Sequence, residues 1–175
     1  MSGKERVLVA YGSKHGATAE IAEALGMALR VAGLEVDVQR ARRVRSPASY
    51  RAVVLGSALY VGRWRREAMR LLRRAELREC DVWLFSSGPV GADEGDPKER
   101  ERWTTPKRVQ EMAADLGAHE HVVFGGMVAE DAGFIRKRMA RKIPAELRDR
   151  RDWHEIEAWA RSIAAALGCR PVTAR

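Results

Sequence analysis

Apolar and polar positions along this chain follow two periodicities. Short apolar or alternating runs, most of them rich in β-branched residues, predict strands at 6–12, 34–38, 52–56, 82–85 and 122–126. Stretches with apolar residues every three to four positions predict helices at 17–32, 64–77, 106–117, 133–143 and 152–168. Because strands alternate with helices, we expect an α/β three-layer sandwich: a five-stranded parallel sheet with right-handed crossovers and helices on both faces.

The ends of several predicted helices carry their own signals. Gly33 supplies a stop after the first helix, and Pro106 can open a later one with Thr105 as its cap. Asp152 followed by Glu155 resembles a capping box at the start of the last helix. The apolar positions of that helix share one face, which we expect to meet the core: Ile156, Trp159, Ala160, Ile163, Ala164 and Leu167.

Composition favours a globular protein with one domain over residues 1–175, since 46% of the residues are hydrophobic. No run of about 18 apolar residues occurs, so no membrane-spanning helix is expected. The polar start that leads directly into a strand predicts no signal peptide. Cys80 and Cys169 are isolated thiols without C-x-x-C spacing, which is typical of a reducing compartment. We therefore expect a cytoplasmic protein.

The chain is strongly basic, with a formal net charge of +8. Its basic residues are dispersed among 24 acidic ones, and no RNP, zinc-finger or homeodomain pattern occurs, so nucleic acid is not an expected partner. A basic surface instead favours acidic ligands or the anionic face of a membrane. The arginine-rich connector at 40–47 is interpreted as a solvated loop.

The most informative stretch joins the first strand to the first helix. A buried strand that turns directly into a helix presents free backbone N–H groups and the positive end of the helix dipole, which suit an anion. Ser13 and Thr18 add hydroxyl groups, Lys14 adds a positive charge, and Gly16 allows close approach of the backbone. The loop matches neither G-x-G-x-x-G nor G-x-x-x-x-G-K-[ST], so it favours the phosphate of a mononucleotide over a dinucleotide or a triphosphate.

Two further loops can meet this one. The segment 56–62 is bracketed by glycines, and 86–91 follows the fourth strand with small residues. In a sheet of order 2-1-3-4-5, the loops after strands one, three and four lie at the same edge, around the point where the strand order reverses. Open α/β sheets bind their ligands at such a point.

From end to end the chain resembles the flavodoxin family. Ser13-Lys14-His15-Gly16-Ala17-Thr18 stands for that family's [TS]-x-T-G-x-T phosphate loop, with His15 in place of its middle threonine. The resemblance implies a flavodoxin-like sheet of order 2-1-3-4-5 with FMN as the cofactor. It also implies that this loop holds the FMN phosphate and that two loops clasp the isoalloxazine ring: Ala58, Leu59, Tyr60, Val61 and Gly62 in one, and Ser87, Gly88, Pro89, Val90 and Gly91 in the other.

Within that family the chain is most similar to flavodoxin-like, menaquinone-dependent protoporphyrinogen oxidases. The shared features are the bracketed loop at 56–62, the strand end at 85–87, Thr105-Pro106 and the closing pattern that begins at Asp152-Trp153. This similarity implies heme biosynthesis: oxidation of protoporphyrinogen IX, an acidic tetrapyrrole, with a quinone as acceptor at the membrane face. Two alternatives stay open, a non-catalytic electron carrier that docks a redox partner protein and a regulatory module without FMN.

Other side chains near these loops are also candidates for the site. Tyr60 and Trp64 are aromatic candidates to flank a flavin, and Arg63, Arg65 and Arg66 are candidates to dock the carboxylates of a substrate. The basic helix at 133–143 can rest on an anionic membrane or pack on the sheet. The histidines lack metal-ligand spacing, and no nucleophile motif occurs, so no catalytic residue and no metal ligand is predicted. A flavoprotein needs neither, because the cofactor performs the redox chemistry.

Overall fold

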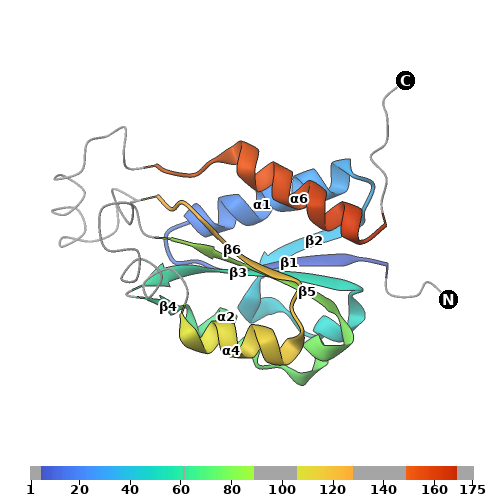
Figure 1. Ribbon diagram of the computed structural model, residues 1–175, viewed down its shortest axis with the longest axis horizontal. Coiled ribbons are helices and arrows are strands. Elements are labelled where there is room, and N and C mark those ends of the chain that lie inside the picture. Colours follow the sequence, from blue (N-terminus) through green and yellow to red (C-terminus); the bar gives the residue numbers. More distant parts are fainter. Residues whose placement is uncertain (1–4, 61, 89–105, 128–148, 169–175) are drawn as a thin grey trace, which may run out of the picture.

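A twisted parallel sheet forms the centre of the molecule (Figure 1). The computed structural model describes residues 5–60, 62–88, 106–127 and 149–168. Within them, the parallel strands lie in the order β2-β1-β3-β5-β6, and a short sixth strand, β4, pairs antiparallel with the end of β3. The strands are β1 (Val7–Gly12), β2 (Val36–Arg40), β3 (Ala52–Tyr60), β4 (Arg63–Trp64), β5 (Asp81–Ser87) and β6 (Glu120–Phe124). Counted without β4, this is the predicted order 2-1-3-4-5, and the α/β flavodoxin-like fold is confirmed.

Helices cover both faces of the sheet. Figure 1 shows α1 (Ala17–Val31) and α6 (Trp153–Ala166) on one face, and α2 (Arg66–Leu72) and α4 (Lys107–Leu116) on the other. Three short 3-10 helices complete the described part: η1 (Ala41–Arg43), η2 (Pro47–Ser49) and η3 (Ala75–Glu79). Two separate apolar clusters fill the two interfaces, one beneath α1 and α6 and one beneath α2 and α4. Burial of these two faces fixes the sandwich, because each helix contributes one apolar stripe.

The predicted helix ends are largely confirmed. Asp152 is the N-cap of α6, and its carboxylate accepts hydrogen bonds from the backbone N–H groups of His154 at 2.9 Å and Glu155 at 3.1 Å. The predicted inward face of α6 is buried, with Ile156 and Ile163 fully so. Helix α1 ends at Val31, two residues before Gly33, whose φ of 94° lies in the left-handed region.

The region after β3 differs from the prediction. β3 does not stop at Gly56 but continues to Tyr60, and it turns back into β4 where a helix was expected to start at Trp64. The predicted helix 64–77 is instead the short α2 followed by η3. The physical reason is tertiary: Leu59 pairs with Trp64 across the hairpin, and both side chains are buried in the cluster beneath α2 and α4. Two smaller differences are that the second strand spans Val36–Arg40 rather than 34–38 and that Ala75, expected to face inward, is exposed.

Two predicted segments lie outside the described residues. They are the acid-containing loop 92–105, which includes Thr105, the expected cap of the helix at 106–117, and the basic helix expected at 133–143. The residues that flank the second segment contact each other: Met127 and Asp149 form an antiparallel bridge, and the Arg150 N–H donates to the Gly126 carbonyl at 3.1 Å.

Candidate functional site

The loop between β1 and α1 has the shape of an anion cradle. Ser13 follows β1 directly, is 4% exposed, and accepts a hydrogen bond on Oγ from the Gly16 backbone N–H at 3.1 Å. Gly16 precedes α1 with φ of 94°, a conformation that favours glycine. A Cβ placed on Gly16 would meet no described atom within 4 Å beyond the adjoining chain. The first turn of the 15-residue helix α1 therefore directs its N–H groups and its dipole toward open space, which fits a phosphate.

The other predicted members of the loop line the same turn. Lys14 is exposed, whereas Thr18 is only 1% exposed in the first turn of α1. His15 and Ala17 are half-buried. The ring of His15 lies 6.3 Å from the ring of Tyr60, centroid to centroid, so the loop reaches the end of β3.

The second predicted segment is a β-hairpin rather than a loop. Ala58 and Tyr60 are half-buried in β3, the side chain of Leu59 is buried in the core, and Gly62 follows in the turn. Val61 lies outside the described residues. The Ser57 hydroxyl accepts a hydrogen bond from the Arg65 backbone N–H at 2.8 Å, which ties the two arms of the hairpin together. Tyr60 is thus presented by a paired strand.

The third predicted segment begins at the end of β5. Ser87 is 5% exposed and Gly88 is buried, and the Gly88 N–H donates to the Phe124 carbonyl at 2.8 Å. Pro89, Val90 and Gly91 lie outside the described residues.

Strand register brings the described parts of the three segments to one edge of the sheet. Gly12 pairs with Ser57, and Ala58 pairs with Ser87, so β1 and β5 end almost level while β3 continues between them to Tyr60. The phosphate loop, the tip of β3 and the end of β5 therefore follow three neighbouring strands. This is the edge at which parallel α/β sheets bind ligands.

A buried polar network that the sequence did not predict supports this edge from below. The Trp64 indole N–H donates to the Ser86 hydroxyl at 2.8 Å, and that hydroxyl lies 2.9 Å from Nε2 of His121. Trp64 is 6% exposed, so it belongs to the core rather than to an open face. Burial lowers the pKa of the His121 imidazole to about 4, and its Nδ1 has no hydrogen-bond partner among the described residues. The three members of this network, Trp64, Ser86 and His121, come from β4, β5 and β6, so no local sequence motif contains them.

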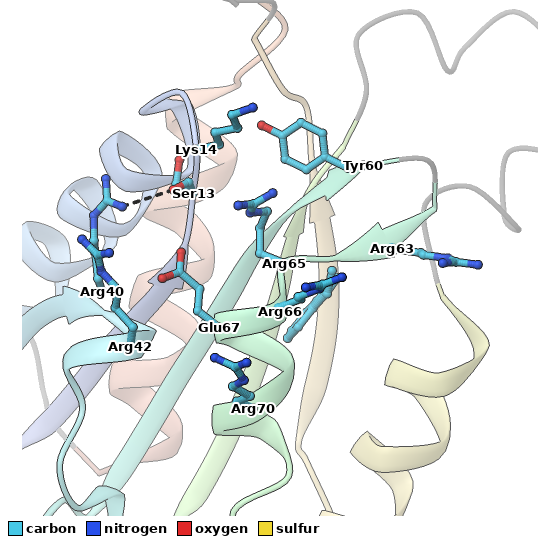
Figure 2. Close-up of a pocket in the computed structure, with 11 residues that line it drawn as sticks. Ser13, Lys14, Arg40, Arg42, Tyr60, Arg63, Arg65, Arg66, Glu67 and Arg70 are labelled. Carbon is cyan, nitrogen blue, oxygen red and sulfur yellow. Dashed lines mark hydrogen bonds between the residues drawn. The ribbon is translucent and has the colours of Figure 1, made fainter.

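Beside the phosphate loop lies a basic cavity of about 750 Å³. Figure 2 shows that its walls come from the end of β2, from η1 and from the start of α2. Six arginines line it together with Ser13, Lys14, Tyr60, Trp64 and Glu67; they are Arg40, Arg42, Arg63, Arg65, Arg66 and Arg70. The segment that begins at Arg40 was expected to be a solvated loop; Arg40 instead ends β2, and Arg42 lies in η1, where it is exposed as expected. The loop's basic composition alone could not show which cavity it would face.

A second cationic centre fixes the chain near the start of α1. The Arg151 guanidinium donates to both Asp149 carboxylate oxygens, at 2.8 and 2.6 Å, and to Glu20 Oε2 at 2.5 Å. Its side chain is 6% exposed. The hydrogen bonds from Arg151 lower the pKa of the Asp149 carboxyl. Arg151 thereby joins the chain before α6 to the first turn of α1, a role that its place in a run of charged residues does not reveal.

The described residues lack two kinds of feature. None of their helices is long and apolar enough to cross a membrane. None of their His, Cys, Asp and Glu side chains gather in threes or more in a way that could hold a metal ion.

Together, the strand order and the cradle at the switch point define a flavodoxin-like α/β protein. The family profile described as "Flavodoxin domain" matches residues 8–153, and the chain belongs to this family. No curated protein matches the chain.

Solved structures share its fold at low sequence identity. A flavodoxin of Streptococcus pneumonia TIGR4 aligns with a TM-score of 0.62 at 19% identity, over 91% of this chain and 98% of that one. Oxidised Flavodoxin 2 from Bacillus cereus aligns with a TM-score of 0.58 at 21% identity, over 93% of this chain and 99% of that one. The rubredoxin oxygen:oxidoreductase of Desulfovibrio gigas aligns with a TM-score of 0.60 at 14% identity, over 98% of this chain but 38% of that one.

Proposed function

We propose that this protein binds FMN at the edge where β1, β3 and β5 end, and that it exchanges electrons with a redox partner protein. The observation that carries the proposal is the cradle at the start of α1, at the same edge of the sheet as the ends of β3 and β5. Six residues would hold the phosphate: Ser13, Lys14, His15, Gly16, Ala17 and Thr18. Segments 58–62 and 87–91 would flank the ring.

The phosphate site would use backbone N–H groups and the α1 dipole for binding, with Lys14 adding charge. The Ser13 hydroxyl already accepts from the Gly16 N–H, so its first contribution is to shape the loop. The imidazole of His15 replaces a threonine of the family pattern. Because its backbone N–H can still donate, we expect His15→Thr to tighten FMN binding or leave it unchanged, measured by flavin fluorescence. A large loss of flavin would assign the imidazole a role of its own.

The ring site would use Tyr60, whose aromatic face is half-exposed beside cationic groups. The Arg65 guanidinium carbon lies 5.4 Å from the centroid of the Tyr60 ring, and His15 approaches from the other loop. When bound, FMN would supply the electron transfer itself, and the protein would set its orientation and electrostatics. Positive charge near the ring stabilises the negative charge that reduction adds, so Arg65→Gln should shift the second reduction potential of the bound flavin to more negative values.

The test of flavin binding compares the two glycines at opposite ends of α1. Gly16 and Gly33 share a φ of 94°, and a Cβ on either meets open space. Alanine at either position costs about 1 kcal/mol of stability, because its Cβ disfavours left-handed backbone. Only Gly16→Ala should also weaken FMN, by about tenfold or more (1.4 kcal/mol), since it redirects the N–H groups of the cradle. A wild-type protein that stays colourless after purification and mixing with FMN would overturn the proposal.

A second candidate function is oxidation of protoporphyrinogen IX with a quinone as acceptor. Arg63 and Arg65 beside Tyr60 favour it, because guanidinium groups can pair with the carboxylates of an acidic tetrapyrrole. Anaerobic mixing of the flavin-loaded protein with protoporphyrinogen and a menaquinone analogue separates the two functions. An oxidase consumes both compounds, whereas an electron carrier leaves both unreacted.

A further inference from the structure

The basic cavity is built from chain segments that the phosphate loop does not include. Arg40 and Arg42 reach it from β2 and η1, and Arg65 and Arg70 reach it from the β4–α2 region (Figure 2). Figure 2 shows that Arg63 points away from the other arginines. Segments more than twenty positions apart in the sequence thus bring their positive charges together at one cavity.

Among the described residues, carboxylates do not balance these positive charges. Glu67 is the single carboxylate that lines the cavity within the described residues. Among the described residues, the arginines that form ion pairs are Arg6, Arg74, Arg151 and Arg161, and none of them lines the cavity. Like charges held together around a concave surface repel one another, and the field that they create attracts anions. A bound polyanion would remove this repulsion.

Arg65 is the clearest sign that the cavity is prepared for a ligand. Its Nε is buried and has no hydrogen-bond partner among the described residues. A buried donor left without a partner is costly, and among the described residues that line the cavity only Arg65 carries such a donor. Its guanidinium rests on the Tyr60 ring, and its backbone N–H is fixed by Ser57. The side chain is therefore held in place before any ligand arrives.

Two close contacts set the cavity against the phosphate loop. A Cβ on Gly12 would lie 3.0 Å from Arg65 Cβ and 3.1 Å from Ala68 Cβ, so the absence of a side chain there lets α2 approach β1. On the other side, Nη1 of Arg40 donates to the Ser13 carbonyl at 3.4 Å. Ser13 and Lys14 consequently belong both to the loop and to the cavity rim.

From this geometry we propose that the cavity is a second anion site, for a small molecule with a phosphoanhydride group such as a nucleoside diphosphate. Guanidinium forks match phosphate oxygens in pairs, and several forks around one cavity select a ligand with more than one charge. The volume of about 750 Å³ falls within the range of small-molecule sites. The Glu67 carboxylate, which lies among the arginines in Figure 2, can accept hydrogen bonds from ribose hydroxyls.

This chemistry has two possible sources. One is a free nucleoside diphosphate. The other is the diphosphate of a dinucleotide flavin, FAD, whose first phosphate would occupy the loop while the second entered the cavity past Ser13 and Lys14. The proposal itself rests on the arginines and not on the flavin, so it stands even if the chain binds no FMN.

The experiment is isothermal titration calorimetry of the full chain with pyrophosphate, in about 0.15 M salt so that diffuse attraction is screened. Pyrophosphate should bind once per chain and more tightly than orthophosphate. The double variant Arg42→Gln/Arg70→Gln should weaken binding by about tenfold or more. The matched control Arg43→Gln/Arg73→Gln removes the same charge from η1 and from the end of α2, at exposed positions that do not line the cavity, and should change affinity less than about twofold.

Competition experiments then identify the source. Binding of ADP by a protein that keeps its flavin supports a free nucleotide, and displacement of pyrophosphate by FAD but not by FMN supports the dinucleotide flavin. Equal affinity for pyrophosphate and orthophosphate would overturn the proposal, as would equal losses in the two double variants. Flavin absorbance is recorded on the same samples, so a failure of the FMN proposal is seen separately.

Discussion

Acidification should destabilise this protein through one residue, His121. Burial lowers the pKa of its imidazole from 6.5 to about 4, so the folded protein keeps it neutral where an unfolded chain would protonate it. Below pH 6.5 the unfolded state therefore binds a proton that the folded state does not, and stability falls with pH until the folded state is also protonated near pH 4. The difference of about 2.5 units at about 1.36 kcal/mol per unit amounts to about 3 kcal/mol.

The assay compares wild type with His121→Gln, which is neutral at every pH and can still hydrogen bond to Ser86. Free energies of unfolding from urea titrations would be measured between about pH 7.5 and about pH 4.5. The wild type should lose about 2 to 3 kcal/mol more than the variant over this interval, because other titrating groups contribute equally to both curves. Nuclear magnetic resonance should show the His121 ring titrating near pH 4.

The physical cause of this loss of stability can be checked as well as its size. Desolvation is the cause of this pKa shift, so the extra loss should persist at high salt, whereas an effect of neighbouring charges would be screened. Parallel stability curves for wild type and His121→Gln, or a ring that titrates above pH 6, would refute the reasoning. Either result would mean that water reaches Nδ1 and that the network with Trp64 and Ser86 is not closed.

Three further predictions concern the fold around the site. A Cβ on Gly56 would overlap the ring of Phe85, so Gly56→Ala should lower the free energy of unfolding by about 1 to 3 kcal/mol, and adding Phe85→Leu should restore part of it. Arg151→Met should lower the free energy of unfolding by about 1 kcal/mol near neutral pH, since the carboxylates that Arg151 pairs with are half-exposed. Because Arg151 lowers the pKa of Asp149, the difference in stability from wild type should shrink as pH falls through the acidic range. A difference that stays constant with pH would contradict this. Asp152→Ala should cost about 1 kcal/mol through loss of the α6 cap, while Asp152→Ser should retain most of the stability in thermal melts.

Features encoded by neighbouring residues were readable from the sequence. Apolar periodicity located the parallel strands and the long helices to within a few residues, and the capping role of Asp152 followed from its side chain and its position. The loop that begins at Ser13 was recognisable because a buried strand, small residues and a helix start follow one another directly. In each case the decisive interactions span only a few positions along the chain.

Tertiary structure decided what distant residues do together. The β3–β4 hairpin overrode the helical periodicity around Trp64, because burial of its indole against Ser86 and His121 stabilises the strand pairing. The same packing buries most of His121 and lowers the pKa of its imidazole. Arg40 and Arg65 became lining residues of one cavity because α2 packs closely on Gly12, a contact between separate elements. The sequence alone thus determined the sheet, its helices and the loop between β1 and α1, and the packing of its elements decided where buried polar groups and converging charges would lie.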